Sequence, residues 1–160
     1  MSNWSSKKIT TVAALVAINV ALSYIIRIPV PATSGYVNLL EGVIFLAALF
    51  MGQKAGFLVG AFSGGLLDLL AGYPHWILFS FLIHGLEGWV AGMAKEKASF
   101  QTVLLLLLSS VIMVLGYFLA ASFLYNWQAA LSSVPGNIAQ TLFGLIVALL
   151  LKKAMPDKLF

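Results

Sequence analysis

The chain has 160 residues, of which 61% are hydrophobic and 9% are charged, and its formal net charge is +4 at pH 7. A soluble domain carries about 25% charged residues, and so short a chain could not bury this much apolar surface, so a soluble fold is excluded. Cysteine is absent, which excludes disulfides and thiolate metal sites, and the basic residues form no stripe typical of nucleic-acid binding.

Apolar runs bounded by charges, proline or turn residues divide the chain into six segments. In chain order they are Ile9–Ile26, Leu39–Met51, Ala55–Ala71, His75–Ala94, Phe100–Tyr125 and Val134–Leu151. The second is short for a full crossing, which takes roughly 17–25 residues. The first has no convincing cleavage site, so it is interpreted as a retained helix rather than a signal peptide. The sequence therefore predicts an all-α integral membrane protein with six transmembrane helices in a single domain, residues 1–160.

The lysines outside these runs segregate to one side of the arrangement. They precede run one, separate runs two and three and runs four and five, and follow run six: Lys7, Lys8, Lys54, Lys95, Lys97, Lys152, Lys153 and Lys158. The opposite side carries only Arg27. Because basic loop residues stay on the cytoplasmic side, we expect a multi-pass plasma membrane protein with both termini in the cytoplasm.

Polar side chains gather toward the outer ends of the predicted helices. Glu41 lies near the outer end of run two, and Asp68 lies one turn below the outer end of run three. Six further polar residues share this outer half, and His84 lies about halfway down run four; the six are Tyr36, Asn38, Tyr73, His75, Asn137 and Gln140. Because charges within a membrane are costly, these nine residues are predicted to line an outward-facing substrate cavity that is closed toward the cytoplasm.

Two alternatives remain open for these polar residues. Tyrosine, tryptophan and asparagine also gather at headgroup level without binding anything, and His84 could instead make an interhelical hydrogen bond. Glu87 follows His84 by one helical turn and could pair with it. A channel is not expected, because its polar lining would continue through the full length of the bundle.

No motif for enzymatic chemistry is present. The chain lacks a G-x-x-x-x-G-K-[ST] phosphate loop, an HExxH motif and a GxSxG nucleophile elbow. Two histidines without cysteine give no reason to expect a metal site, and no cofactor is expected. An intramembrane enzyme that uses His84 and Glu87 is therefore the minority interpretation.

Small residues recur every four positions on three of the runs. They are Ala13, Ala17 and Ala21 on run one, Gly56, Gly60 and Gly64 on run three, and Gly88 and Gly92 on run four. Such spacing lets helix backbones approach closely in lipid. The glycines are interpreted as intramolecular packing sites, whereas the alanine row could face a neighbouring helix or another protein.

The stretch from Gly35 to Leu49 resembles the GYINLGD-x-x-IFLAA signature of the substrate-binding S components of energy-coupling factor (ECF) vitamin transporters. The run that ends Asp68-Leu69-Leu70-Ala71-Gly72-Tyr73-Pro74 continues the resemblance, and Ile83–Gly88 is similar to the family's IKGLEG segment. The resemblance covers about Ala13 to Gly92. Leu40-Glu41 stands in place of the commoner Gly-Asp, and His84 in place of a frequent lysine.

This resemblance implies partners that composition could not show. S components work with a transmembrane coupling protein and two cytoplasmic ATPases, and the row Ala13, Ala17 and Ala21 matches the surface that contacts the coupling protein. It also implies that the S component topples in the membrane to carry bound vitamin inward. The loop from Pro29 to Asn38 would act as the lid.

The charges narrow the substrate further. Glu41 and Asp68 face a single cation in the outer half, so they would repel a polyanionic ligand. A small neutral or cationic heteroaromatic ring is favoured, with aromatic residues for stacking. We expect a hydroxymethylpyrimidine (a thiamine precursor) or a pyridoxine-like compound, with pantothenate and riboflavin less favoured. The alternative function is a non-transport membrane scaffold whose polar groups only fix helix packing.

Overall fold

The computed structural model describes residues 4–33 and 35–156, so Lys158 lies outside the described residues. Helices dominate: α1 Ser6–Ile25, α2 Leu40–Met51, α3 Gln53–Ala71, α4 Ile77–Ala91, α5 Ser99–Leu124 and α6 Trp127–Ala154. A short 3₁₀ turn, η2 Gly92–Ala94, continues α4. Five of the described helices are long and apolar enough to cross a membrane, whereas α2 has 12 residues. The prediction of a helical membrane protein is confirmed at this level.

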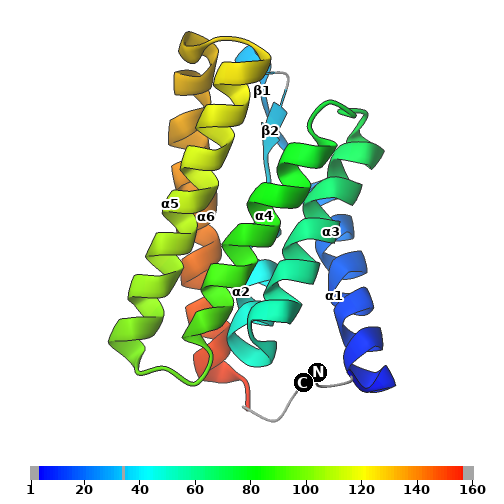
Figure 1. Ribbon diagram of the computed structural model, residues 1–160, viewed down its shortest axis with the longest axis vertical. Coiled ribbons are helices and arrows are strands. Elements are labelled where there is room, and N and C mark those ends of the chain that lie inside the picture. Colours follow the sequence, from blue (N-terminus) through cyan, green and yellow to red (C-terminus); the bar gives the residue numbers. More distant parts are fainter. Residues whose placement is uncertain (1–3, 34, 157–160) are drawn as a thin grey trace.

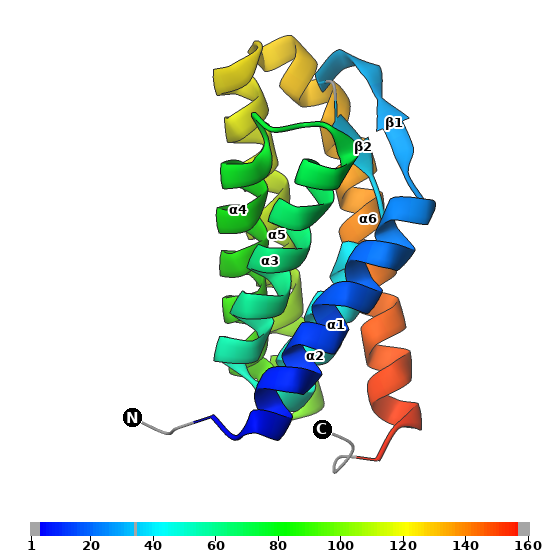
Figure 2. The same cartoon turned by 90° about the vertical axis from the view of Figure 1, so that its right-hand side faces the viewer.

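Five helices form a ring, and the sixth packs outside it. Neighbours around the ring are α2, α3, α4, α5 and α6, and α6 contacts α2 to close it. α1 lies against α3 and α2 on the outside of this ring (Figure 1). Figure 2 shows that the start of α1 and the end of α6 lie at the same end of the bundle. The ring therefore encloses an interior that five helices can line.

The short α2 is the most enclosed helix. Ile44, Phe45, Ala47 and Ala48 are fully buried on different sides of it. It is held by α1, α3, α4 and α6 together. Its polar residue Glu41 is also fully buried, so it faces protein rather than lipid. α2 therefore occupies an enclosed position in the ring, below the end of the bundle that carries the hairpin (Figure 2).

Glycines bring α3 and α4 into direct backbone contact. A Cβ placed on Gly56 would overlap the carbonyl of Gly88, and one on Gly60 would overlap the carbonyl of His84. Only glycine permits this approach. The contact confirms the packing role predicted for these glycines, and it fixes the height at which the α4 side chains enter the ring.

Two features differ from the prediction. The loop after α1 contains a two-stranded antiparallel hairpin, β1 Ile28–Val30 and β2 Gly35–Val37, joined through the 3₁₀ turn η1 Pro31–Thr33. In addition, α6 begins at Trp127 rather than Val134, since Asn126 caps its first turn and Pro135 is accommodated inside the helix. As a result, Asn137 and Gln140 lie at mid-helix and not in the outer turns of run six.

The outward faces of the long helices are apolar. On α5 and α6 they expose leucine, isoleucine and phenylalanine side chains, among them Leu104, Leu119, Phe123, Phe143, Ile146 and Leu150. In water this surface would be unstable, whereas lipid tails match it. The buried polar residues of α6 instead face the inside of the ring, among them Ser133, Asn137 and Gln140.

Candidate functional site

A cavity opens inside the ring beneath the hairpin. The hairpin and every ring helix contribute to it: Val30, Gly35, Tyr36, Asn38, Leu40, Gly64, Asp68, Trp76, Ser80, Met113, Tyr117, Ser133, Asn137 and Gln140. Its volume is about 540 Å³ with the open space at its mouth included.

The hairpin is fastened over the cavity by Tyr36. Its hydroxyl donates to Asp68 Oδ1 at 2.6 Å, and its ring lies 5.5 Å from that of Tyr73. Burial, followed by the nearby Asp68 carboxylate, raises the pKa of Tyr36 well above its usual value. Tyr36 therefore keeps its proton and remains a donor. Arg27 lies over the rings of Tyr24, at 4.1 Å, and Tyr36, at 5.7 Å, on the outer side.

A second connection ties the hairpin to α6 and α2. The backbone N–H of Asn38 donates to Gln140 Oε1 at 2.6 Å, and Gln140 Nε2 donates to Glu41 Oε1 at 2.8 Å. The Asn38 side chain accepts from the Leu40 N–H at 2.8 Å and so satisfies a donor at the start of α2. These bonds make the end of the hairpin part of the wall of the cavity.

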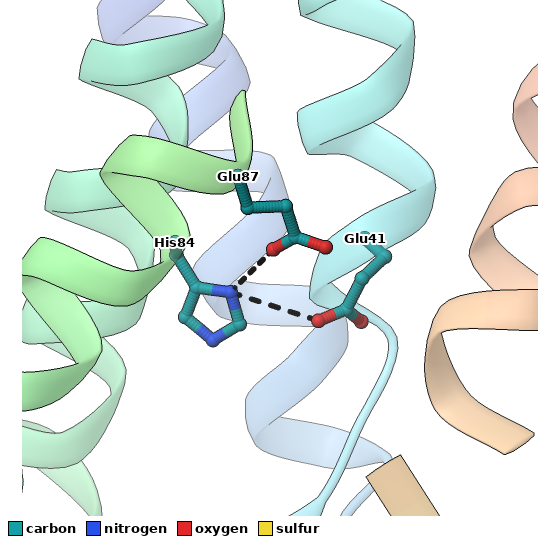
Figure 3. Close-up of side chains that lie close together, drawn as sticks. All are labelled: Glu41, His84 and Glu87. Carbon is teal, nitrogen blue, oxygen red and sulfur yellow. Dashed lines mark hydrogen bonds and ion pairs between the residues drawn. The ribbon is translucent and has the colours of Figure 1, made fainter. Parts of the chain in front are cut away.

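A chain of hydrogen bonds leads from the cavity into the interior. Ser80 Oγ and the Tyr117 hydroxyl are 2.7 Å apart, and this hydroxyl lies 3.0 Å from His84 Nε2. His84 Nδ1 is 2.9 Å from Glu87 Oε2, as the helical spacing predicted, and 3.6 Å from Glu41 Oε1 (Figure 3). The wall of the cavity is therefore connected to a cluster of ionisable groups beneath it.

Two lining residues keep a buried polar atom without a hydrogen-bond partner among the described residues. They are the acceptor Asp68 Oδ2 and the donor Trp76 Nε1. An unpaired buried polar group costs about 1–3 kcal/mol. The Ser80 side chain also lies within interaction range of the Asp68 carboxylate, so Asp68 contacts both the hairpin and α4.

The nine predicted site residues fall into three groups. Five line the cavity: Tyr36, Asn38, Asp68, Asn137 and Gln140. Glu41 and His84 lie one layer deeper, in the interior cluster. Tyr73 and His75 lie in the outer α3–α4 loop, where His75 Nε2 is 2.8 Å from the Tyr125 hydroxyl.

Sequence reasoning missed Trp76, Ser80, Tyr117 and Ser133, which also line the cavity. A periodic signal was available on α4, because positions 76, 80, 84 and 87 share one helical face. Ser133, Asn137 and Gln140 show the same spacing on α6. Tyr117 had no such signal, since it stands within a long apolar run.

The alanine row of α1 lies on a different surface. Ala13, Ala17 and Ala21 are exposed, and the first two line an apolar groove between α1 and α3. None of the three lines the cavity.

Comparison with known proteins agrees with this architecture. A family model described as "ECF-type riboflavin transporter, S component" matches residues 3–157. "Thiamine precursor transporter HmpT" of Lactococcus lactis subsp. cremoris is 34% identical over 149 residues, which cover 92% of this chain and 87% of that protein. "Uncharacterized protein in gap 3'region" of Pyrococcus woesei is 38% identical over 128 residues, or 77% of this chain and 84% of the relative.

A solved structure shares the fold. It is described as "Structure and mechanism of the S component of a bacterial ECF transporter", and the superposition has a TM-score of 0.73 at 21% identity, covering 92% of this chain and 94% of the other. The resemblance drawn from the Gly35–Leu49 motif is thereby confirmed, and the chain is a transporter subunit of the plasma membrane rather than an enzyme. It belongs to the family of ECF-type transporter S components.

Proposed function

We propose that this S component binds a small heteroaromatic vitamin precursor, a hydroxymethylpyrimidine or a pyridoxine-like compound, in the cavity beneath the hairpin. The observation that carries the proposal is the pair of unpartnered buried atoms, Asp68 Oδ2 and Trp76 Nε1, on residues that line this cavity. An aminopyrimidine offers an amino N–H donor beside a ring-nitrogen acceptor, which is the complementary set.

The charge of the cavity supports the same class. Asp68 is acidic, and no lysine or arginine stands among the described lining residues. A carboxylate accepts strongly from amino or hydroxyl groups, whereas it would repel the carboxylate of pantothenate.

The relatives point to two ring systems. The family description names riboflavin, whereas the relative from Lactococcus lactis is named as a thiamine precursor transporter and aligns with 92% of this chain. We propose the thiamine precursor rather than riboflavin, because its donor and acceptor groups complement the polar atoms of the cavity.

Each site residue has a role in this proposal. Tyr36 and Asn38 hold the hairpin as a lid, and Asp68, Asn137 and Gln140 contact the substrate. Glu41 and His84 support the floor through Gln140 and Tyr117. Tyr73 packs against Tyr36 with its ring tilted, and His75 holds the outer loop against Tyr125.

We further propose six transmembrane crossings with both termini in the cytoplasm, in one domain over residues 1–160. The positive-inside rule supports this orientation. The start of α1 and the end of α6 lie at one end of the bundle, and the hairpin lies at the other (Figure 2). The short α2 completes its crossing together with the extended segment that precedes it.

The partners follow from membership in the family. We propose that the exposed row Ala13, Ala17 and Ala21 packs against the transmembrane coupling protein, since small residues allow helices to approach closely. Two cytoplasmic ATPases would supply the energy, because this chain has no phosphate loop of its own.

The test is to purify the protein in detergent and identify, by mass spectrometry, any small molecule released on denaturation. A pyrimidine or pyridine vitamin at near one-to-one stoichiometry is expected. If the protein is empty, a panel of B vitamins is tested for a shift in unfolding temperature. Failure of every vitamin to raise that temperature would overturn the proposed substrate class.

A further inference from the structure

Three metal-ligating side chains meet beneath the cavity. Glu41 comes from α2, and His84 and Glu87 come from α4; one ligand atom from each lies within 4.8 Å of the others. Figure 3 shows both carboxylates beside the same imidazole nitrogen, His84 Nδ1. All three side chains are 1% exposed or less, so water does not solvate them.

The charge of this cluster is not balanced by other side chains. Among the residues that the structure describes, neither Glu41 nor Glu87 forms an ion pair with a lysine or an arginine. Two carboxylates with a neutral imidazole would carry two negative charges in a low-dielectric interior, which is costly. One divalent cation would bring the assembly to neutrality.

Unpartnered atoms point independently to a ligand. Glu41 Oε2 and Glu87 Oε1 are buried and have no hydrogen-bond partner within the described part of the chain. Lone pairs left in this way are available to a cation. The other oxygens of the same two carboxylates, Glu87 Oε2 and Glu41 Oε1, lie 2.9 Å and 3.6 Å from His84 Nδ1. Ligand atoms about 2.0–2.2 Å from one metal ion are separated by roughly such distances.

The surrounding residues would orient these ligands. Gln140 Nε2 donates to Glu41 Oε1 at 2.8 Å and fixes that carboxylate. The Tyr117 hydroxyl lies 3.0 Å from His84 Nε2. When Nδ1 coordinates a metal, Nε2 carries the proton and donates to this hydroxyl, as metal-bound histidines commonly do to an outer partner.

We propose that Glu41, His84 and Glu87 form a structural site for one divalent transition-metal ion with nitrogen and oxygen ligands, such as Zn²⁺, which joins α2 to α4 under the substrate cavity. The presence of only two histidines and no cysteine gave no reason to expect a metal site. The sequence could not show that Glu41 lies next to His84 and Glu87 of α4. The site is separate from the substrate cavity and does not depend on which vitamin is bound.

The test uses the full chain without an affinity tag, in detergent. Chelator-treated protein is titrated with Co²⁺ and followed by visible absorption, and with Zn²⁺ followed by metal analysis after desalting and by unfolding temperature. One equivalent of metal is expected, with Co²⁺ bands typical of fewer than six ligands and a higher unfolding temperature. His84→Ala and Glu87→Gln should each lose this binding, whereas His75→Ala, which removes the other histidine, should retain it.

Absence of stoichiometric metal on the wild-type protein overturns the proposal, even if the variants fail to fold. If metal binding survives Glu87→Gln and is lost in His75→Ala, the protein binds an adventitious ion only, and the proposal is wrong. Vitamin binding measured on the same metal-free samples separates the two proposals, because vitamin bound without any metal site leaves the proposed function intact.

Discussion

Asp68→Asn isolates the polar contact at the centre of the proposed site. The substitution keeps the size of the side chain and leaves one oxygen to accept the Tyr36 hydroxyl, now at 2.6 Å from Oδ1. It replaces the unpartnered Oδ2 with an NH₂ group, which cannot accept from the substrate. A hydrogen bond to a charged group contributes about 1.5–3 kcal/mol. At about 1.4 kcal/mol per tenfold change, the substrate should bind about 10- to 150-fold more weakly.

Isothermal titration calorimetry with hydroxymethylpyrimidine measures this change, and thermal unfolding without ligand supplies the control. The ligand-free stability should fall by about 1 kcal/mol or less, because a neutral hydrogen bond to Tyr36 replaces a charge-assisted one. Tyr36→Phe is the matched variant, since it removes the lid bond and leaves the Asp68 carboxylate for the substrate; its loss of affinity should be smaller. An affinity for Asp68→Asn within twofold of the wild type would refute the assignment.

Three further predictions address the partner surface, the helix packing and the lid. Ala17→Leu should leave vitamin binding unchanged but abolish uptake by the assembled transporter, whereas Ala139→Leu, at an exposed position on α6, should leave uptake normal. Gly60→Ala should destabilise the protein by about 1–3 kcal/mol or more in denaturant unfolding, because its Cβ would overlap the His84 carbonyl; Gly42→Ala, whose Cβ would meet Val147 at 3.6 Å, should be tolerated. Because the pKa of Tyr36 is raised on folding, first by burial, the stability that it contributes is complete below its unfolded pKa of about 10 and is lost as the pH rises above that value. The wild type should therefore lose more stability than Tyr36→Phe between pH 8 and pH 11, and equal losses would contradict the assignment.

Hydropathy predicted the helices well because lipid imposes one simple requirement on every segment. A run such as Phe100–Tyr125 has no other stable structure in a bilayer, and α5 spans Ser99–Leu124. The hairpin escaped notice because it lies between two apolar runs and has strands of only three residues. The start of α6 was misplaced because Pro135 and Gly136 usually end helices in water, whereas here the helix continues through them.

The predicted depth of a residue accounts for part of the cavity lining. Tyr36, Asn38 and Asp68 were all expected in the outer half, and in the structure all three line the cavity. Depth could not show that Glu41 lies beneath this cavity, because that depends on how α2 sits among four other helices. Contacts between helices distant in sequence, such as that between Glu41 and Gln140, leave no periodic trace in a single chain.

Direct titration of the purified protein with hydroxymethylpyrimidine, pyridoxine and riboflavin tests whether the cavity binds a single-ring vitamin precursor. We expect saturable one-to-one binding of a single-ring compound, strongest for one of the first two, and little or no binding of riboflavin. Tight binding of riboflavin alone, or binding of a single-ring compound that is unaffected by Asp68→Asn, would contradict it.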